Sequence, residues 1–337
     1  MLGSGASGRN AAILRTFSCD QVLDPIARRG AAFLRRPPAG FAQVPLVDPT
    51  GSLLAASGER AARWRAALPA PGGREVTRDE ARRLAPHLSE AALAAELHLW
   101  FEHDGRIDVA ALIEALAAGA RSSGIELRTG CSAARLLVER GRVVGVELVD
   151  GSRISAATTV LAAGAWAGTL GRSAGSRVAL RPTRRHLLVT APDPALDTRL
   201  PIVWLEDEGF YARPESGGML LCACDEDDVD PDRCESDPAM RERIAGKTTR
   251  LLALEGDPGA AHFWHGLRTL TPDGRFVVGP DPDLGGLVWV AGLGGHGMTC
   301  GVEVGRLAAR AVRRAQRSSN VNQSAFVKRS GPKMPST

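Results

Sequence analysis

The sequence predicts an α/β protein in which a parallel-sheet domain is interleaved with a domain of mostly antiparallel strands. Two apolar segments, residues 158–162 and 287–291, each run into a glycine-containing turn, as buried strands that feed a helix often do. Between them, residues 178–264 contain short alternating segments that favour antiparallel pairing. The 337 residues, 44% hydrophobic and 24% charged, suffice for one large or two interleaved domains.

Two helix starts carry capping signals. Thr77 is followed three residues later by Glu80, a capping box that predicts a polar helix to about Leu84. Asp108 precedes a periodic apolar stretch and predicts a helix over Val109–Arg121 that ends at Gly124. Further helices are expected near residues 238–254 and over residues 300–314.

Short strands are predicted from alternation and from turn residues. Ile125–Arg128 predicts a strand, and two alternating segments flank the Arg140-Gly141 hairpin turn at residues 136–139 and 143–148. The remaining expected strands are residues 178–180, 186–190, 202–205, 209–213, 218–223 and 276–278.

Charge and cysteine usage indicate the broad class of protein. The chain has no apolar run long enough to cross a membrane and no secretory signal, and its six cysteines are scattered. We therefore expect free thiols and a cytoplasmic protein, either free or peripheral at the inner membrane, with no integral membrane segment. Six Lys and Arg residues without any acid lie in residues 313–337, which predicts a disordered basic tail.

Two matches to the pattern G-x-G-x-x-G differ in context. The first, Gly3–Gly8, follows no strand, so we reject it as a dinucleotide-binding turn. The second, Gly292–Gly297, follows the buried strand 287–291 and opens a helix. A helix start offers free N–H groups to a ligand, whereas the alternative is that these glycines only allow close packing.

Other candidate sites are weaker. Cys222 and Cys224 are explained by alternation along a strand, and no ligand spacing completes a metal site, so no metal is expected. The acidic run Asp225–Asp228 predicts a solvated loop. Tyr211 is the only tyrosine, and no basic patch with aromatic residues indicates nucleic-acid binding.

Four segments together resemble one superfamily, that of D-amino-acid oxidase, glycine oxidase and sarcosine oxidase. They are residues 3–12, 160–166, 266–274 and 292–299, and the resemblance extends over about residues 3–312. Residues 37–41, 182–185 and 209–221 resemble the D-arginine dehydrogenase branch.

The resemblance implies an FAD/NAD(P)-binding, Rossmann-like domain interleaved with an antiparallel-sheet substrate domain. In the superfamily a βαβ unit with the phosphate-binding turn precedes the stretch that resembles residues 3–12, and we expect that unit to be missing here. The implied boundaries are residues 1–35, 100–177 and 265–312 for the FAD-binding domain, 36–99 and 178–264 for the substrate domain, and 313–337 for the tail.

The resemblance also implies a chemistry, in which a hydride passes from the substrate Cα–H to flavin N5 and the imine formed is hydrolysed to an oxo acid. Arg268 matches the arginine that pairs with the substrate carboxylate, and Tyr211 matches the tyrosine that donates a second hydrogen bond to it. Arg185 is a candidate second cation, with Arg184 as its competitor. His296 either lines the pocket or simply hydrogen-bonds to the backbone.

The resemblance also implies which residues bind FAD, most of them in or beside glycine-containing turns. They are Ser7, Gly8, Arg9, Asn10, Ala11, Ala12, Ala133, Ala163, Gly164, Trp166, Gly294, Gly295, Gly297, Met298 and Thr299. Those after Gly294 are expected to place helix N–H groups near the flavin pyrimidine edge, where charge develops on reduction.

In the D-arginine branch an acidic residue holds the guanidinium group of the substrate. The corresponding place here is near Gly51-Ser52, and neither residue is acidic. The expected substrate is therefore a neutral D-amino acid, glycine or an N-methyl amino acid. Oxygen or a quinone is the expected electron acceptor. The alternative is a non-catalytic remnant that cannot hold FAD. A nicotinamide dehydrogenase has no βαβ unit to support it.

Overall fold

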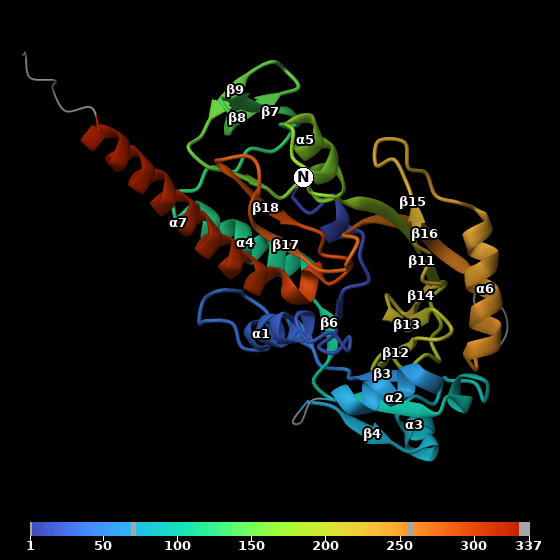
Figure 1. The fold of residues 1–337 in the computed structure, drawn as a ribbon. Coiled ribbons are helices and arrows are strands. Elements are labelled where there is room, and N and C mark those ends of the chain that lie inside the picture. Colours follow the sequence, from blue (N-terminus) through green and yellow to red (C-terminus); the bar gives the residue numbers. More distant parts are fainter. Residues whose placement is uncertain (1, 69–71, 255–258, 330–337) are drawn as a thin grey trace, which may run out of the picture.

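A computed structural model describes residues 2–68, 72–254 and 259–329, with side chains described as far as residue 316. Within these residues, nine strands form one mixed sheet (Figure 1). Its order is β15-β11-β14-β13-β12-β3-β5-β4, and β16 pairs with β11. The sheet therefore combines strands from two distant parts of the chain, residues 52–101 and 181–270.

The strands of this sheet have the following bounds: β3 Ser52–Ala56, β4 Arg74–Val76, β5 Leu97–Phe101, β11 Arg181–Thr190, β12 Ile202–Leu205, β13 Phe210–Glu215, β14 Gly218–Cys222, β15 Asp227–Asp228 and β16 Ala260–Leu270. Most neighbours are antiparallel, but β3 and β12 run parallel, with Ser52 opposite Ile202. One large core cluster lies between this sheet and the helices α3 (Arg78–Leu84) and α6 (Ala239–Leu251).

A second, smaller sheet contains the two apolar strands that the sequence predicts. β10 (Thr159–Leu161) and β18 (Leu287–Ala291) pair in parallel, and β17 (Val277–Pro280) pairs antiparallel with β18. Helix α7 (Gly297–Arg329) packs against β17 and β18 and also lies along α1 (Leu23–Arg35), as Figure 1 shows. The start of α7 therefore lies at the end of a buried strand.

The remaining elements connect these sheets. They are η1 Ala6–Gly8, β1 Ile13–Leu14, β2 Val47–Asp48, α2 Gly58–Ala67, η2 Ala92–Ala94, β6 Gly105–Ile107, α4 Val109–Ser122, β7 Ala133–Glu139, β8 Arg142–Leu148, β9 Arg153–Ser155, η3 Gly164–Trp166 and α5 Ala167–Ser173. Strands β1, β6 and β2 form a small antiparallel sheet, and β7, β8 and β9 form a meander.

Both capping predictions are confirmed. The Thr77 side chain accepts a hydrogen bond from the N–H of Glu80 at 3.2 Å, and Asp108 accepts one from the N–H of Ala111 at 2.8 Å. Each bond satisfies an N–H group that the first helical turn leaves free. The hairpin at Arg140-Gly141 is also confirmed between β7 and β8.

Three predictions of local structure are wrong. Residues 125–128 form no strand, and Ile125 is 56% exposed, because no neighbouring strand is present among the described residues to pair with it. Residues 178–180 precede β11 rather than forming a separate strand. The stretch 313–329, expected to be disordered, continues α7, since its Ala, Arg and Gln residues favour helix; residues 330–337 lie outside the described residues.

The outer edge of β10 pairs with no other strand among the described residues, because β10 ends the order β10-β18-β17. Val160, in the middle of this strand, is 44% exposed. An open strand edge with an exposed apolar residue at its centre is where a further strand could pair.

Candidate functional site

The sole tyrosine lies at the centre of the predicted site. Tyr211 on β13 faces Cys222 on β14 across the antiparallel register, and its ring stacks on Trp204 of β12 with centroids 4.5 Å apart. The side chain is only 1% exposed. Burial and the neighbouring Cys222 raise the pKa of the Tyr211 hydroxyl well above its usual value, with Arg268 acting in the opposite direction. The hydroxyl is therefore a neutral hydrogen-bond donor at physiological pH.

Arg268 on β16 lies beside this tyrosine and against the glycine turn that precedes α7. Gly295 approaches the Arg268 guanidinium so closely that a Cβ atom there would lie 2.7 Å from Cζ. Within the described residues, no carboxylate or carbonyl lies within hydrogen-bonding distance of this guanidinium. A half-buried cation without an acidic partner can bind an anion without first breaking an ion pair.

His296 is half-buried in the same turn, next to Gly295. Its pKa is lowered to about 4, with burial as the largest cause and the Arg15 and Arg268 guanidinium groups as further ones. The backbone N–H of His296 donates to Leu293 O at 2.8 Å. The imidazole is therefore neutral at pH 7 and adds no charge to the site.

Arg185 and Arg184, adjacent on β11, have different surroundings. Arg185 is 5% exposed, pairs with Glu226 at 3.2 Å, and acts electrostatically on Tyr211 and Cys222. Arg184 instead donates to the carbonyl of Glu235 at 2.6 Å. The arrangement therefore brings Arg185, rather than Arg184, to the Tyr211 cluster.

The acidic run is only partly a solvated loop. Asp225 is buried and accepts hydrogen bonds from the His186 N–H at 2.9 Å and from His186 Nδ1 at 2.7 Å. His186 Nε2 accepts from the N–H of Asp237, so the proton of this ring lies on Nδ1. Asp225 was therefore wrongly predicted to be solvated; it fixes β11 beside the cluster.

The segment before β1 forms a second wall of the site. Arg213 Nε donates to Ala11 O at 2.6 Å, and Trp264 Nε1 donates to Arg9 O at 3.2 Å. The Asn10 side chain accepts from the N–H of Ala12, where φ is +52°. These bonds join residues 9–12 to β13 and β16, the strands that carry Tyr211 and Arg268.

The start of α7 is joined to the same segment. The Thr299 hydroxyl accepts from the N–H of Arg15 at 3.2 Å and donates to Ile13 O at 3.3 Å. Gly294 and Gly295 have positive φ values of 51° and 95°, which permit the tight turn into Gly297. Met298 packs in a core cluster with Leu14, so its side chain serves packing.

The other candidate residues lie in or beside the short helices η1 and η3, both of which contact β16, and at the start of β7. Ser7 and Gly8 are in η1, and Ala133 opens β7 in the separate meander sheet. Ala163 and Gly164 follow β10, and Trp166 Nε1 donates to Asp232 at 2.6 Å.

Sequence reasoning missed Arg15, Trp204 and the role of Cys222. The Arg15 guanidinium lies over the Trp204 ring at 4.2 Å, and Trp204 in turn stacks on Tyr211. Arg15 Nε donates to Phe17 O at 2.7 Å. No motif marks these residues; only the strand register and the fold bring them to Tyr211.

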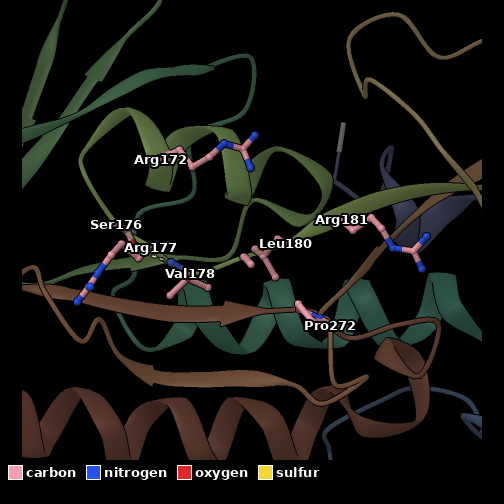
Figure 2. Close-up of a pocket in the computed structure, with 8 residues that line it drawn as sticks. Arg172, Ser176, Arg177, Val178, Leu180, Arg181 and Pro272 are labelled. Carbon is pink, nitrogen blue, oxygen red and sulfur yellow. Dashed lines mark hydrogen bonds between the residues drawn. The ribbon is translucent and has the colours of Figure 1, made fainter.

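A cavity of about 550 Å³ lies elsewhere, between the segment after α5 and the turn at Pro272. Figure 2 shows three arginines around it, Arg172, Arg177 and Arg181. Arg177 and Arg181 already pair with Asp283 and Asp228. None of the predicted catalytic residues lines this cavity, so we assign the site by the geometry around Tyr211.

Neither a metal site nor a membrane-spanning helix is present in the described part of the chain. Within residues 2–68, 72–254 and 259–329, no group of three His, Cys, Asp or Glu side chains could hold a metal ion. The helices in those ranges include none with the length and apolar character that crossing a bilayer requires.

Comparisons with known proteins agree with this fold. The chain is similar to a D-amino acid dehydrogenase of Cereibacter sphaeroides, with 31% identity over 290 residues, and to a glycine oxidase of Pseudomonas putida, with 32% identity over 163 residues. The first match covers 86% of this chain and 57% of the dehydrogenase. The second covers 48% of this chain and 43% of the glycine oxidase. The chain thus spans less than two thirds of the length of these curated relatives.

Solved structures show the same architecture. The glycine oxidase from Geobacillus kaustophilus superposes with a TM-score of 0.76 at 24% identity, over 93% of this chain and 86% of that one. The L-proline dehydrogenase from P. horikoshii gives a TM-score of 0.79 at 20% identity, over 91% and 83%. The family model described as FAD dependent oxidoreductase matches residues 1–311, and the chain therefore belongs to that family.

Proposed function

We propose that this chain carries the substrate site and the flavin-ring wall of an enzyme that oxidises the Cα–N bond of a small amino acid. The observation that carries the proposal is the unpaired Arg268 guanidinium beside the buried Tyr211 hydroxyl. A guanidinium and a neutral hydroxyl together can bind both oxygens of a carboxylate. The relatives named D-amino acid dehydrogenase and glycine oxidase support an amino acid as substrate.

The electrostatics of the cluster favour a single substrate carboxylate. Arg185 is paired with Glu226, and Arg15 lies 3.5 Å from Glu206, so Arg268 is the cation that a carboxylate reaches at least cost. The neutral His296 does not compete for that anion.

The residues of the site fit the flavin ring system better than the rest of FAD. The N–H groups at the start of α7 and the backbone of residues 9–12 lie on two sides of the Arg268 cluster. Bound FAD would accept the hydride and supply the redox chemistry. Strand β18, its glycine turn and helix α7 are followed by no second strand among the described residues, so they do not complete the βαβ unit that binds a pyrophosphate.

A neutral substrate side chain is favoured by the environment of Ser52. Its hydroxyl donates to the buried Asp104 at 2.9 Å, and Asp104 also accepts from Thr16 Oγ1 at 2.7 Å. The buried Asp104 carboxylate near this strand start is thus already bound by hydroxyl groups. A neutral D-amino acid, glycine or an N-methyl amino acid remains the proposed substrate class.

Flavin uptake and amino-acid-dependent bleaching test the proposal. The purified chain is incubated with FAD, and flavin absorbance is followed under nitrogen with glycine, sarcosine, D-alanine, D-aspartate and D-arginine. We expect bleaching by one of the neutral compounds, and reoxidation by air or by a quinone then identifies the acceptor. Arg268→Lys should raise the half-saturating substrate concentration at least tenfold, whereas the exposed Arg121→Lys should not change it.

The alternative function is a remnant that cannot hold FAD, and the open edge of β10 is the observation that favours it. A chain that takes up no FAD at any concentration supports the remnant. If the chain binds FAD but none of the amino acids bleaches the bound flavin, the proposed oxidation is excluded. The cofactor assignment would still hold.

A further inference from the structure

Two cysteines adjoin the Tyr211 cluster, and the proposed oxidation uses neither of them. Cys222, the last residue of β14, is fully buried, and Cys224 is partly exposed. Although β14 ends at Cys222, both side chains pack in the hydrophobic cluster that contains Tyr211 and Trp204.

The backbone holds the two thiols together. The N–H of Cys224 donates to Cys222 Sγ at 3.4 Å, and the chain turns at Cys224, where φ is +51°. Even a fully extended chain separates Cα atoms two residues apart by only about 7 Å. A turn shortens that distance into the range of about 4.4–6.8 Å that a disulfide spans.

The surroundings favour one thiolate in this pair. Burial acts to raise the pKa of Cys222, but hydrogen bonding from Cys224 and the buried Arg185 outweigh it and lower the pKa to about 6. The pKa of Cys224 is raised, since its S–H donates to Cys222 and the site is buried. At neutral pH the pair therefore carries one proton between two sulfur atoms.

We propose that Cys222 and Cys224 are a peroxide-reactive thiol pair that closes to an intramolecular disulfide beside the substrate site. The contact between the two residues, the partial exposure of Cys224 and the electrostatic influence of Arg185 carry this proposal. It does not rest on the proposed amino-acid oxidation, because the oxidant is a small hydroperoxide supplied from solution.

The reaction balances in two steps. The Cys222 thiolate attacks one peroxide oxygen; the O–O bond breaks, a sulfenic acid forms at Cys222, and the hydroxide released takes up a proton to become water. The Cys224 sulfur then attacks the Cys222 sulfur, the S–S bond forms and the S–O bond breaks. The leaving hydroxide takes the Cys224 proton as water. Two thiols lose two electrons, and hydrogen peroxide is reduced to two waters.

Mass spectrometry of the wild-type chain tests the proposal directly. Trypsin releases residues 200–233 as one peptide, because Arg213 precedes a proline, and Cys222 and Cys224 are its only cysteines. After mild hydrogen peroxide treatment and alkylation, we expect this peptide to lose two hydrogens and take up no alkyl group. The exposed Cys131, in another peptide, should remain alkylated at the same peroxide dose.

The pH dependence and two variants complete the experiment. Disulfide formation should slow about tenfold per pH unit below about pH 6, as the thiolate is lost. Cys224→Ser should abolish it, and Cys131→Ser should leave it unchanged. Recovery of two alkylated thiols in the wild-type peptide, at a dose that oxidises Cys131, overturns the proposal. So does a disulfide from Cys222 to any cysteine other than Cys224.

Discussion

Gly295 and Arg268 are in direct contact, and the contact leaves no room for a side chain at residue 295. A Cβ atom there would lie 2.7 Å from Arg268 Cζ and 3.0 Å from Nε, and φ at Gly295 is +95°. Only glycine adopts that backbone conformation without strain. The turn before α7 and the proposed carboxylate-binding arginine thus constrain each other.

We expect Gly295→Ala to displace the Arg268 guanidinium and to raise KM at least tenfold, with a stability loss of about 1–3 kcal/mol from backbone strain. Gly301→Ala is the matched control. Gly301 lies within α7 with open space around its Cα, so alanine there should stabilise the helix by about 0.5–1 kcal/mol. Both variants are measured by steady-state kinetics and urea unfolding. A Gly295→Ala variant with the same KM as the wild type would show that Arg268 does not bind the substrate.

Tyr211→Phe deletes only a hydroxyl while keeping the stack on Trp204. Because a hydrogen bond to a charged group contributes about 1.5–3 kcal/mol, substrate affinity should fall at least tenfold. Trp204 fluorescence should stay unchanged in the free protein, since the aromatic stack remains. A variant that binds substrate normally would show that the hydroxyl serves packing or the Cys222 contact instead.

Protonation of the buried His87 ring should destabilise the protein in acid. It is 6% exposed, neither ring nitrogen has a hydrogen-bond partner among the described residues, and burial lowers its pKa to about 4. The unfolded chain, with a pKa near 6.5, binds the proton first, so the stability is complete above about pH 6.5 and is lost as the pH falls towards 4. This one group can remove about 3 kcal/mol.

His87→Leu should flatten that part of the pH profile and raise stability at pH 7, because it removes two buried nitrogens without partners. The measurement is thermal unfolding of both proteins between pH 4 and pH 8. Parallel profiles for wild type and variant would mean that the ring protonates without unfolding the chain.

Asp104 joins three segments through its buried carboxylate. It accepts hydrogen bonds from Thr16 and Ser52 and lies 3.6 Å from Arg35. Asp104→Ala leaves these donors without an acceptor and should cost about 2–4 kcal/mol. The exposed Glu114→Ala, on α4, should change stability by less than about 0.5 kcal/mol. Similar urea midpoints for the two variants would contradict this role.

The sequence predicts those parts of the fold that local chemistry determines. The caps at Thr77 and Asp108 and the strand over Leu287–Ala291 depend on residues close in sequence, and all three are confirmed. The strand expected at residues 125–128 depends on a partner, and none is present among the described residues. Its alternation alone could not reveal that.

The candidate site could be proposed from sequence only where a motif marks it. Arg268 and Tyr211 were proposed because neighbouring residues resemble a superfamily. Cys222 lies opposite Tyr211 through the β13–β14 register, and Arg15 reaches Trp204 across the fold, so neither carries a local signal. Asp225 was misassigned because a run of acids favours solvent unless a buried partner such as His186 is known.

The parallel pairing of β3 with β12 has a consequence for how the protein folds during synthesis. Ser52 lies opposite Ile202, so the pairing closes a loop of 150 residues. At about 5–20 residues per second, a ribosome needs roughly 8–30 s to make that stretch. During this time β3, with its apolar residues Leu53 and Leu54, has no partner on the edge that later pairs with β12. Chaperones that shield hydrophobic strands should therefore bind the nascent chain before residue 205 emerges.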